Sequence, residues 1–171
     1  EKQDELLGQV EEFFTLRLKN IFLDREVPHH VIDLLLSNNE LSVADVEGLV
    51  NALLANRIDE DVELVQAYTR MYNLVKDVEY TGVNSDLLKE DAEKALFEAA
   101  SKASEVSSAA WEAGDYDAVV AVPATLVPAI NKFFEDVMVM DKDEAIKANR
   151  LQLVRLAYSV MAIIGDISAL K

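Results

Sequence analysis

Cysteine is absent from this 171-residue sequence, and histidine is almost absent. Without cysteine the chain has no disulfide bond, no thiolate metal site and no cysteine nucleophile, and a reducing compartment such as the cytoplasm is the expected location. The two histidines, His29 and His30, are adjacent. Paired metal ligands on a helix lie four residues apart on one face, so we assign both histidines a structural role and expect no metal site.

Glycine and proline are also scarce, with five and three copies. The chain is instead rich in alanine, leucine, glutamate, lysine and valine, which favours long helices over many short strands. The longest stretch without a charged residue, 118–131, is shorter than the roughly 20 apolar residues that a membrane-spanning helix needs, and it contains Pro123 and Pro128. The composition therefore predicts an all-α fold and no membrane partner.

Sequence motifs of the common enzyme classes are missing as well. The chain has no glycine-rich phosphate loop, no GxSxG, no HExxH and no calcium-binding loop. Pairs of acidic residues are abundant, but in so acidic a chain they carry little information about acid–base catalysis. We expect no catalytic, cofactor-binding or metal-binding residue here, and an autonomous hydrolase or nuclease is the least favoured function.

Positive charge is scarce and unevenly distributed. Lysine and arginine total 16 against 32 acidic residues, a net charge of -16, which argues against non-specific binding of polyanions such as DNA. Residues 86–117 hold nine acids and three bases, whereas 65–76 holds two bases and no acid. Segments 13–25 and 145–171 are also locally basic. These three basic segments are the candidates for binding an anion.

Hydrophobic periodicity predicts a bundle of about seven helices. We treat residues 1–171 as one domain, with a possible sub-domain break in the loop at 80–85. The first helix is expected to end before Val27, the second to run from Pro28 to Ser37, and the third to be capped by Ser42 with Asp45. The fourth should begin at 59–61, and the fifth should run from Ser85 or Asp86 to about Ala113. The sixth should run from about Tyr116 to Val139, with Pro123 and Pro128 bending or dividing it, and the seventh should follow 141–143.

For several apolar and aromatic side chains we compare packing in the core with an exposed binding role. Tyr68 and Tyr72 fall in the apolar stripe of the fourth helix, so we expect both to face the core. The Val-Met-Val-Met sequence at 137–140 is an adaptable exposed surface or, as we expect, core packing. Trp111 could stack on a nucleobase, but we favour anchoring of a neighbouring helix.

Arg150 occupies an unusual position, because it shares the apolar row of the seventh helix with Leu153 and Ala157. An arginine in such a row must be paired, extend to the edge of the core, or contact something outside the chain. Either Asn149 and Arg150 bind an external ligand, or they tie the seventh helix to the end of the sixth through Asp136 or Asp141. Both hypotheses remain open at this stage.

The stretch FFEDVMVMDKDEAIKANRLQLVRL, from Phe133, resembles the carboxyl-terminal end of bacterial glycyl-tRNA synthetase beta subunits. That family has a phenylalanine pair, an acidic residue, Val-Met-Val-Met, a short acidic linker, Asn-Arg-Leu in the last helix, and a closing Asp-[Ile/Leu]-Ser. The segments FTLRL at 14–18 and RMYNL at 70–74 also resemble family segments. The chain departs from the family at Lys147, where arginine is common, and at Asn131, where aspartate is common.

The resemblance implies a DALR-type anticodon-binding domain, which is an all-helical bundle. It implies a module of the glycine–tRNA ligase that binds glycine tRNA and supports aminoacylation in protein biosynthesis in the cytoplasm. In the intact enzyme, which uses ATP and magnesium, the alpha subunit carries most of the machinery for glycine activation. We expect this chain, which opens with EKQDELL, to be part of a longer protein and not to be catalytic alone.

Under this hypothesis, basic and amide side chains in the three basic segments contact phosphates or base edges of an unstacked RNA loop. The candidate tRNA-binding residues are Arg17, Lys19, Arg70, Asn73, Lys147, Asn149, Arg150 and Arg155. The alternative function is an acidic helical scaffold that mediates subunit or domain contacts without direct RNA readout.

Overall fold

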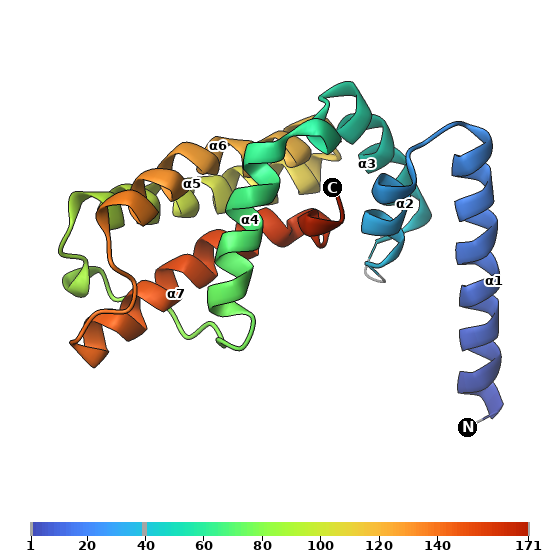
Figure 1. The fold of residues 1–171 in the computed structure, drawn as a ribbon. Helices are drawn as coiled ribbons and strands as arrows, with labels where there is room; N and C mark the ends of the chain where they lie inside the picture. The colour runs from blue at the N-terminus through green and yellow to red at the C-terminus, as the bar shows by residue number, and fades with distance from the viewer. Residues whose placement is uncertain (1, 39–40, 171) are drawn as a thin grey trace.

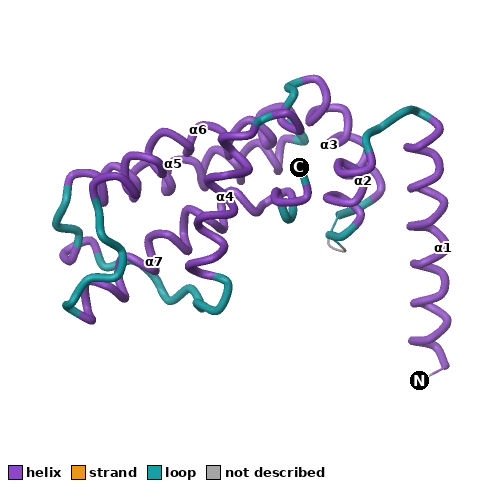
Figure 2. Tube along the Cα trace, viewed as in Figure 1, coloured by secondary structure: helices purple, strands orange, loops and turns teal. Residues whose placement is uncertain are grey.

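The computed structural model describes residues 2–38 and 41–170, with side chains described from residue 13 onward except at residue 59. All regular elements in these ranges are helical, which confirms the predicted fold class (Figure 1, Figure 2). The α-helices are α1 (Lys2–Asp24), α2 (His29–Leu36), α3 (Val43–Ala55), α4 (Val62–Val75), α5 (Asp91–Ala113), α6 (Tyr116–Asp136) and α7 (Glu144–Met161). Short 3-10 helices are η1 (Ile58–Glu60), η2 (Ser85–Leu87), η3 (Ala162–Ile164) and η4 (Ile167–Ala169).

The largest helix contact is the hairpin of α5 and α6, which lie side by side (Figure 1). Gly114 connects them with a φ of 67°, a left-handed conformation that glycine adopts without steric cost. Small residues on the buried face of α5, among them Ala100, Ala103 and Ser107, let the two backbones approach closely. Helix α7 packs on α4, α5 and α6, while α2 and α3 cover the other end of the molecule.

Helix α1 stands away from the bundle and leads to the amino terminus (Figure 1). Its carboxyl-terminal end contacts α2, where Phe22 is buried and the Lys19 Nζ lies 2.8 Å from the Asp33 Oδ1. Further along the same helix, Phe13 and Phe14 are exposed. Helix α1 is therefore attached to the core mainly through its last turns.

Most predicted helix starts are confirmed, because local side chains determine them. Ser42 and Asp45 form the expected capping box of α3, and the Asp61 side chain accepts from the backbone N–H of Leu64 at the start of α4. Pro28 precedes α2 as predicted.

The predicted start of the fifth helix is wrong. Ser85 and Asp86 belong to the 3-10 helix η2, and α5 begins at Asp91 instead. The Glu93 carboxylate folds back to accept from the backbone N–H groups of Lys89 and Glu90, so a second capping box fixes the start of α5 five residues later. The segment before it is left as a loop.

Helix α6 continues through both prolines, so of the two predicted effects, bending or division, division does not occur, and the helix ends at Asp136 rather than at the predicted Val139. Each internal proline removes one backbone hydrogen bond, yet the buried apolar residues on both sides of Pro123 hold the helix together by packing. By length and composition α6 could cross a membrane. We interpret it as a core helix, because Val119, Leu126 and Phe133 are buried against α3, α4 and α5.

The carboxyl-terminal residues close the core at the junction of α2 and α4. Ile167 and Leu170 are both buried there. Gly165 makes the turn with a φ of 127°, and a Cβ at this position would lie 3.0 Å from a methyl carbon and 3.1 Å from the carbonyl oxygen of Leu34. Both the backbone angle and the close contact require glycine.

Candidate functional site

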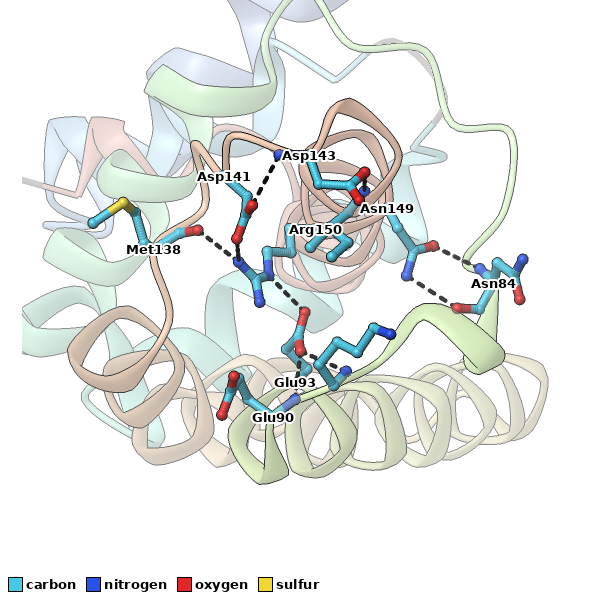
Figure 3. Close-up of polar contacts among 10 residues, drawn as sticks. Asn84, Glu90, Glu93, Met138, Asp141, Asp143, Asn149 and Arg150 are labelled. Atoms are coloured by element: carbon cyan, nitrogen blue, oxygen red, sulfur yellow. Dashed lines mark hydrogen bonds and ion pairs between the residues drawn. The ribbon is translucent and has the colours of Figure 1, made fainter.

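Arg150 is buried on α7, with 5% of its surface exposed, and all of its contacts shown in Figure 3 are internal. Its Nε donates to the Glu93 Oε1 at 2.7 Å. Its Nη1 donates to the Met138 carbonyl oxygen at 2.9 Å and to the Asp141 Oδ2 at 2.7 Å. One guanidinium therefore joins α7 to the start of α5 and to the segment that follows α6.

Glu93 is the anionic partner within the core, with 0% of its surface exposed. Burial by itself raises the pKa of this carboxyl group. Hydrogen bonds from Arg150 and from the backbone N–H groups of Glu90 and Lys89, together with the arginine charge, outweigh burial and hold the pKa of Glu93 below its ordinary value. Glu93 is therefore ionised at neutral pH and forms a charged pair with Arg150.

These contacts decide between the two hypotheses for Arg150. The predicted tie through Asp141 is confirmed, whereas Asp136 instead bonds Lys132, with 3.0 Å between the Lys132 Nζ and the Asp136 Oδ1. Glu93, which the sequence did not suggest, is the more buried partner. The guanidinium is occupied by protein groups, so we assign Arg150 to the architecture of the site rather than to ligand contact.

Asn149, the neighbouring candidate, is also occupied, because it holds the loop between α4 and η2. Its Oδ1 accepts from the Asn84 backbone N–H at 2.7 Å, and its Nδ2 donates to the Asn84 carbonyl oxygen at 3.0 Å (Figure 3). Gln152 forms a second pair of this kind, with the Thr81 N–H at 2.8 Å and the Glu79 carbonyl at 3.0 Å.

Arg155 continues this row, because its Nε donates to the Val78 carbonyl oxygen at 3.0 Å. Asn149, Gln152 and Arg155 are spaced by three residues and lie along one side of α7. Together they form what we call the α7 ladder, which binds the backbone of the loop at 78–84. The position of this loop therefore depends on side chains of α7.

The Val-Met-Val-Met sequence at 137–140, which we call the methionine segment, is not entirely in the core, contrary to the prediction. Val137 and Val139 are buried, but Met138 is 74% exposed and Met140 is 56% exposed. The segment leaves α6 with Val137 in an extended conformation, at φ −115° and ψ 126°, and it bends at residues 139–140, where the Asp141 N–H donates to the Val139 carbonyl oxygen at 3.0 Å. Alternate side chains lie on opposite sides of the segment, so the valines enter the core and the methionines face outward.

The outward face of α4 carries one exposed acid, Glu63, in its first turn, and polar and basic side chains after it. Arg70, Asn73 and Lys76 are exposed, and residues 65–76 contain no aspartate or glutamate. Tyr72 is 43% exposed, so the prediction that it faces the core is wrong. It lies about 80° around the helix from Leu64, at the edge of the apolar stripe, where its ring packs on Tyr158 with 6.1 Å between centroids.

Between α4 and the methionine segment lies a groove of about 430 Å³, which we call the α4 groove. Arg70 and Asn73 line one side, Met138 and Met140 line the other, and Phe134 contributes an aromatic wall. The Arg70 guanidinium carbon lies over the Phe134 ring at 4.1 Å from its centroid, a cation–π contact. Within the described part of the chain, Arg70 forms no ion pair with a carboxylate.

The remaining sequence candidates are not brought to this groove. Arg17 and Lys19 lie on α1, which stands apart from α4 and α7 in Figure 1, and Lys19 is paired with Asp33. Lys147, at the start of α7, pairs with Glu144 at 3.1 Å. Arg155 packs beside the Tyr158 ring at 5.2 Å. The structure therefore brings Arg70 and Asn73 together in the α4 groove, places Arg155 beside Val78 and Tyr158, and separates Arg17 and Lys19 from them.

Five contributors to this region were not among the sequence candidates. Lys76 extends the basic face of α4, Gln152 completes the α7 ladder, and Phe134, Met138 and Met140 line the groove. The alternation of valine and methionine was the available signal for the last two, because period two indicates an extended segment with two different faces.

Elsewhere, the expected anchoring role of Trp111 is confirmed. Its half-buried ring meets the Tyr116 ring edge-to-face, with 6.2 Å between centroids, and joins the end of α5 to the start of α6. Among the described side chains, no group of three histidine, cysteine, aspartate or glutamate residues is arranged to hold a metal ion.

Comparison with known proteins gives a consistent family. Residues 64–167, from α4 to η4, match the DALR anticodon binding domain. This range contains the Arg150 contacts, the α7 ladder and the α4 groove.

Several curated relatives are named glycine–tRNA ligase beta subunit. The protein from Clostridioides difficile is 34% identical over 169 residues, covering 97% of this chain and 24% of the relative. Those from Desulforapulum autotrophicum and Neisseria meningitidis serogroup B are 34% and 32% identical, covering 98% and 95% of this chain and 25% and 24% of the relatives. The chain thus spans about a quarter of the length of these proteins.

Proposed function

Because this chain belongs to the DALR anticodon binding domain family, we propose that it holds the anticodon stem and loop of glycine tRNA as a module of a glycine–tRNA ligase. The names of its relatives supply the amino acid and the enzyme. In this proposal the chain supports aminoacylation in the cytoplasm and is not catalytic by itself. Its partners are glycine tRNA and the alpha subunit of the intact ligase, which uses ATP and magnesium.

One observation carries the proposal, namely that residues 65–76, which form most of α4, contain two bases and no acid. Arg70, Asn73 and Lys76 are exposed there on a protein of net charge -16. Residues 86–117, by contrast, hold nine acids and three bases, so they repel a phosphate backbone, whereas the cations of this run attract it. Arg155 on the adjoining α7 adds a guanidinium whose terminal nitrogens have no hydrogen-bond partner among the described residues.

The proposed binding is weak and salt-sensitive when the chain acts alone. Only a few cations contact phosphates, and the surrounding acids repel RNA at low ionic strength over about 10 Å or more. An anticodon hairpin is the suitable ligand, because proteins read unstacked loop bases more readily than the deep groove of an RNA duplex.

The test is a low-salt titration of the chain with the glycine tRNA anticodon hairpin and with a hairpin of the same stem and a changed anticodon. We expect binding of both, with tighter binding of the glycine hairpin, measured by fluorescence anisotropy. Equal affinity for the two hairpins would mean that the chain holds the RNA backbone without reading the anticodon. No binding of either hairpin at low salt would refute the proposal.

The alternative function, an acidic scaffold between protein parts, is favoured by a different observation. Helix α1, which stands away from the bundle in Figure 1, carries exposed apolar side chains, among them Phe13, Phe14 and Leu16. Exposed aromatic residues gathered on one helix are typical of a protein–protein contact. This alternative predicts tight association with the other parts of the ligase together with no detectable hairpin binding.

A further inference from the structure

We propose that the α4 groove receives one nucleobase turned out of the RNA loop, which lies against Met138 and Met140 with its edge toward Asn73 and its backbone near Arg70. This inference rests on the proposed function and deepens it, because it assigns a base-binding site to particular residues. The groove has room for a base, with a volume of about 430 Å³.

The lining of the groove fits the two kinds of surface that a base presents. Met138 and Met140 are exposed beside the aromatic wall of Phe134, and methionine thioethers are polarisable groups that pack well against flat aromatic rings. Every base has such a flat face, so an apolar and aromatic wall holds it by stacking. The base edge needs polar partners, and the Asn73 amide offers both a donor and an acceptor.

Arg70 adds the charge that selects a nucleotide over an apolar peptide. Its guanidinium carbon lies over the Phe134 ring at 4.1 Å from the centroid, so the cation is held at the groove by an aromatic side chain. No described carboxylate pairs with it. A backbone phosphate of the bound nucleotide would supply an anion for Arg70, which an apolar protein segment would not.

The groove wall is fixed before any ligand arrives, and Arg150 is the positioning residue. Its Nη1 holds the Met138 carbonyl and the Asp141 carboxylate, while the buried Val137 and Val139 anchor the same segment from below. Methionine side chains that are presented by a fixed backbone lose less conformational freedom on binding than those on a flexible loop. The buried guanidinium therefore serves RNA binding indirectly.

The experiment is a scan of the glycine anticodon hairpin with a single abasic site at each loop position in turn. Its affinity for the chain is compared with that for the Met138→Ala/Met140→Ala double variant. Both methionines are exposed, so we expect the double variant to fold, which circular dichroism checks. The matched control is Val106→Ala, an exposed apolar residue of α5 outside the groove.

We expect one abasic position to weaken binding to the unmodified chain by roughly tenfold, as loss of one stacked base does. The double variant should bind the intact hairpin with about the same loss, and the abasic site should then cost it nothing further, because the same contact is removed twice. Val106→Ala should behave as the unmodified chain does.

Three outcomes overturn the inference in distinguishable ways. If the intact hairpin binds but every abasic site has the same effect on the unmodified chain and on the double variant, the base lies elsewhere and only this inference fails. If the intact hairpin does not bind the unmodified chain, the inference and the proposed function fail together. Loss of association with other ligase parts in the double variant, with hairpin binding unchanged, would assign the groove to a protein partner instead.

A second variant separates stacking from charge at Arg70. Arg70→Lys keeps the positive charge and removes the planar group that lies on Phe134. We expect this variant to retain the salt dependence of hairpin binding and to lose part of the sensitivity to the abasic site. An unchanged abasic sensitivity would exclude the guanidinium plane from the base site.

Discussion

At the scale of single residues, Arg150 shows how one side chain serves structure and site together. It neutralises Glu93 inside the core and holds the backbone of the methionine segment. A buried ion pair adds little stability compared with apolar residues of equal size, because both charges lose their hydration. Removing only one partner is costly, however, because the other charge then remains buried and unpaired.

The first residue-scale prediction follows from this asymmetry. Arg150→Met should lower the free energy of unfolding by about 3–5 kcal/mol, measured by urea denaturation. Adding Glu93→Gln to that variant should restore part of the loss, because the unpaired charge disappears. The control Lys147→Met, which removes an exposed pair with Glu144, should leave the midpoint nearly unchanged. Wild-type stability of Arg150→Met would contradict the assigned role.

The second concerns pH and follows from the lowered pKa of Glu93. A carboxyl group whose pKa is lower in the folded state than in the unfolded state stabilises the fold above its unfolded value, here an ordinary 4.5. That stabilisation is lost as the pH falls from 4.5 through the lower folded pKa. Unfolding measured across this acid range should therefore depend less steeply on pH in Glu93→Gln than in the unmodified chain. Identical slopes would show that Glu93 is not held in its charged form.

At the scale of elements, the sequence predicts the helices better than the connections between them. The start of α3 depends on Ser42 and Asp45, three residues apart, so a local pattern is sufficient. The partner of Arg150 on α5 is 57 residues away in the chain, and no local pattern identifies it. The delayed start of α5 has the same origin, because Glu93 serves the cap and the arginine at once.

The exposure of individual side chains was predictable only in part. The burial of Arg150 follows from its row on α7, whereas Tyr72 lies at the edge of its stripe, where the position of the neighbouring Tyr158 decides its exposure. Core packing was predicted for Met138 and Met140, but the backbone of the methionine segment turns both side chains outward. The periodicity of apolar residues indicates on which side of a helix a residue lies, and tertiary packing decides whether another element covers that side.

The element-scale prediction concerns the α7 ladder. Gln152→Ala removes both hydrogen bonds to the loop backbone and should speed amide hydrogen exchange at Thr81, while the Asn84 amide stays protected by Asn149. Asn149→Ala should give the reverse pattern. Each variant is the control for the other, and equal loss of protection at both amides in either variant would show that the loop opens as one unit. We expect each lost pair to cost about 1–3 kcal/mol of stability.

At the scale of the whole molecule, charge is distributed so that a strongly acidic protein keeps one face open to an anion. The acids concentrate in 86–117, mostly on α5, whereas α4 between Val65 and Lys76 has none. Sequence counting predicted this segregation, because charge along a helix is visible without coordinates. It did not predict that the basic segment on α1 lies far from the one on α4.

The whole-molecule prediction tests this distribution through salt. Arg70→Ala should reduce the slope of log affinity against log salt for hairpin binding by about one unit, because one phosphate contact is lost. Lys102→Ala, an equal change of charge on the exposed face of acidic α5, should leave the slope unchanged. Equal slopes for Arg70→Ala and the unmodified chain would remove Arg70 as a phosphate contact.

The α7 ladder has one more implication, for how this protein tolerates change. Its rungs engage only main-chain groups of the loop, at Val78, Glu79, Thr81 and Asn84, and never a loop side chain. Substituting Tyr80, whose side chain is exposed, should therefore be nearly neutral, whereas Gly82, with a φ of 108°, and Val83, which packs against the core, should tolerate less. Inserting or deleting a single residue in this loop should misalign its backbone with the side chains of α7.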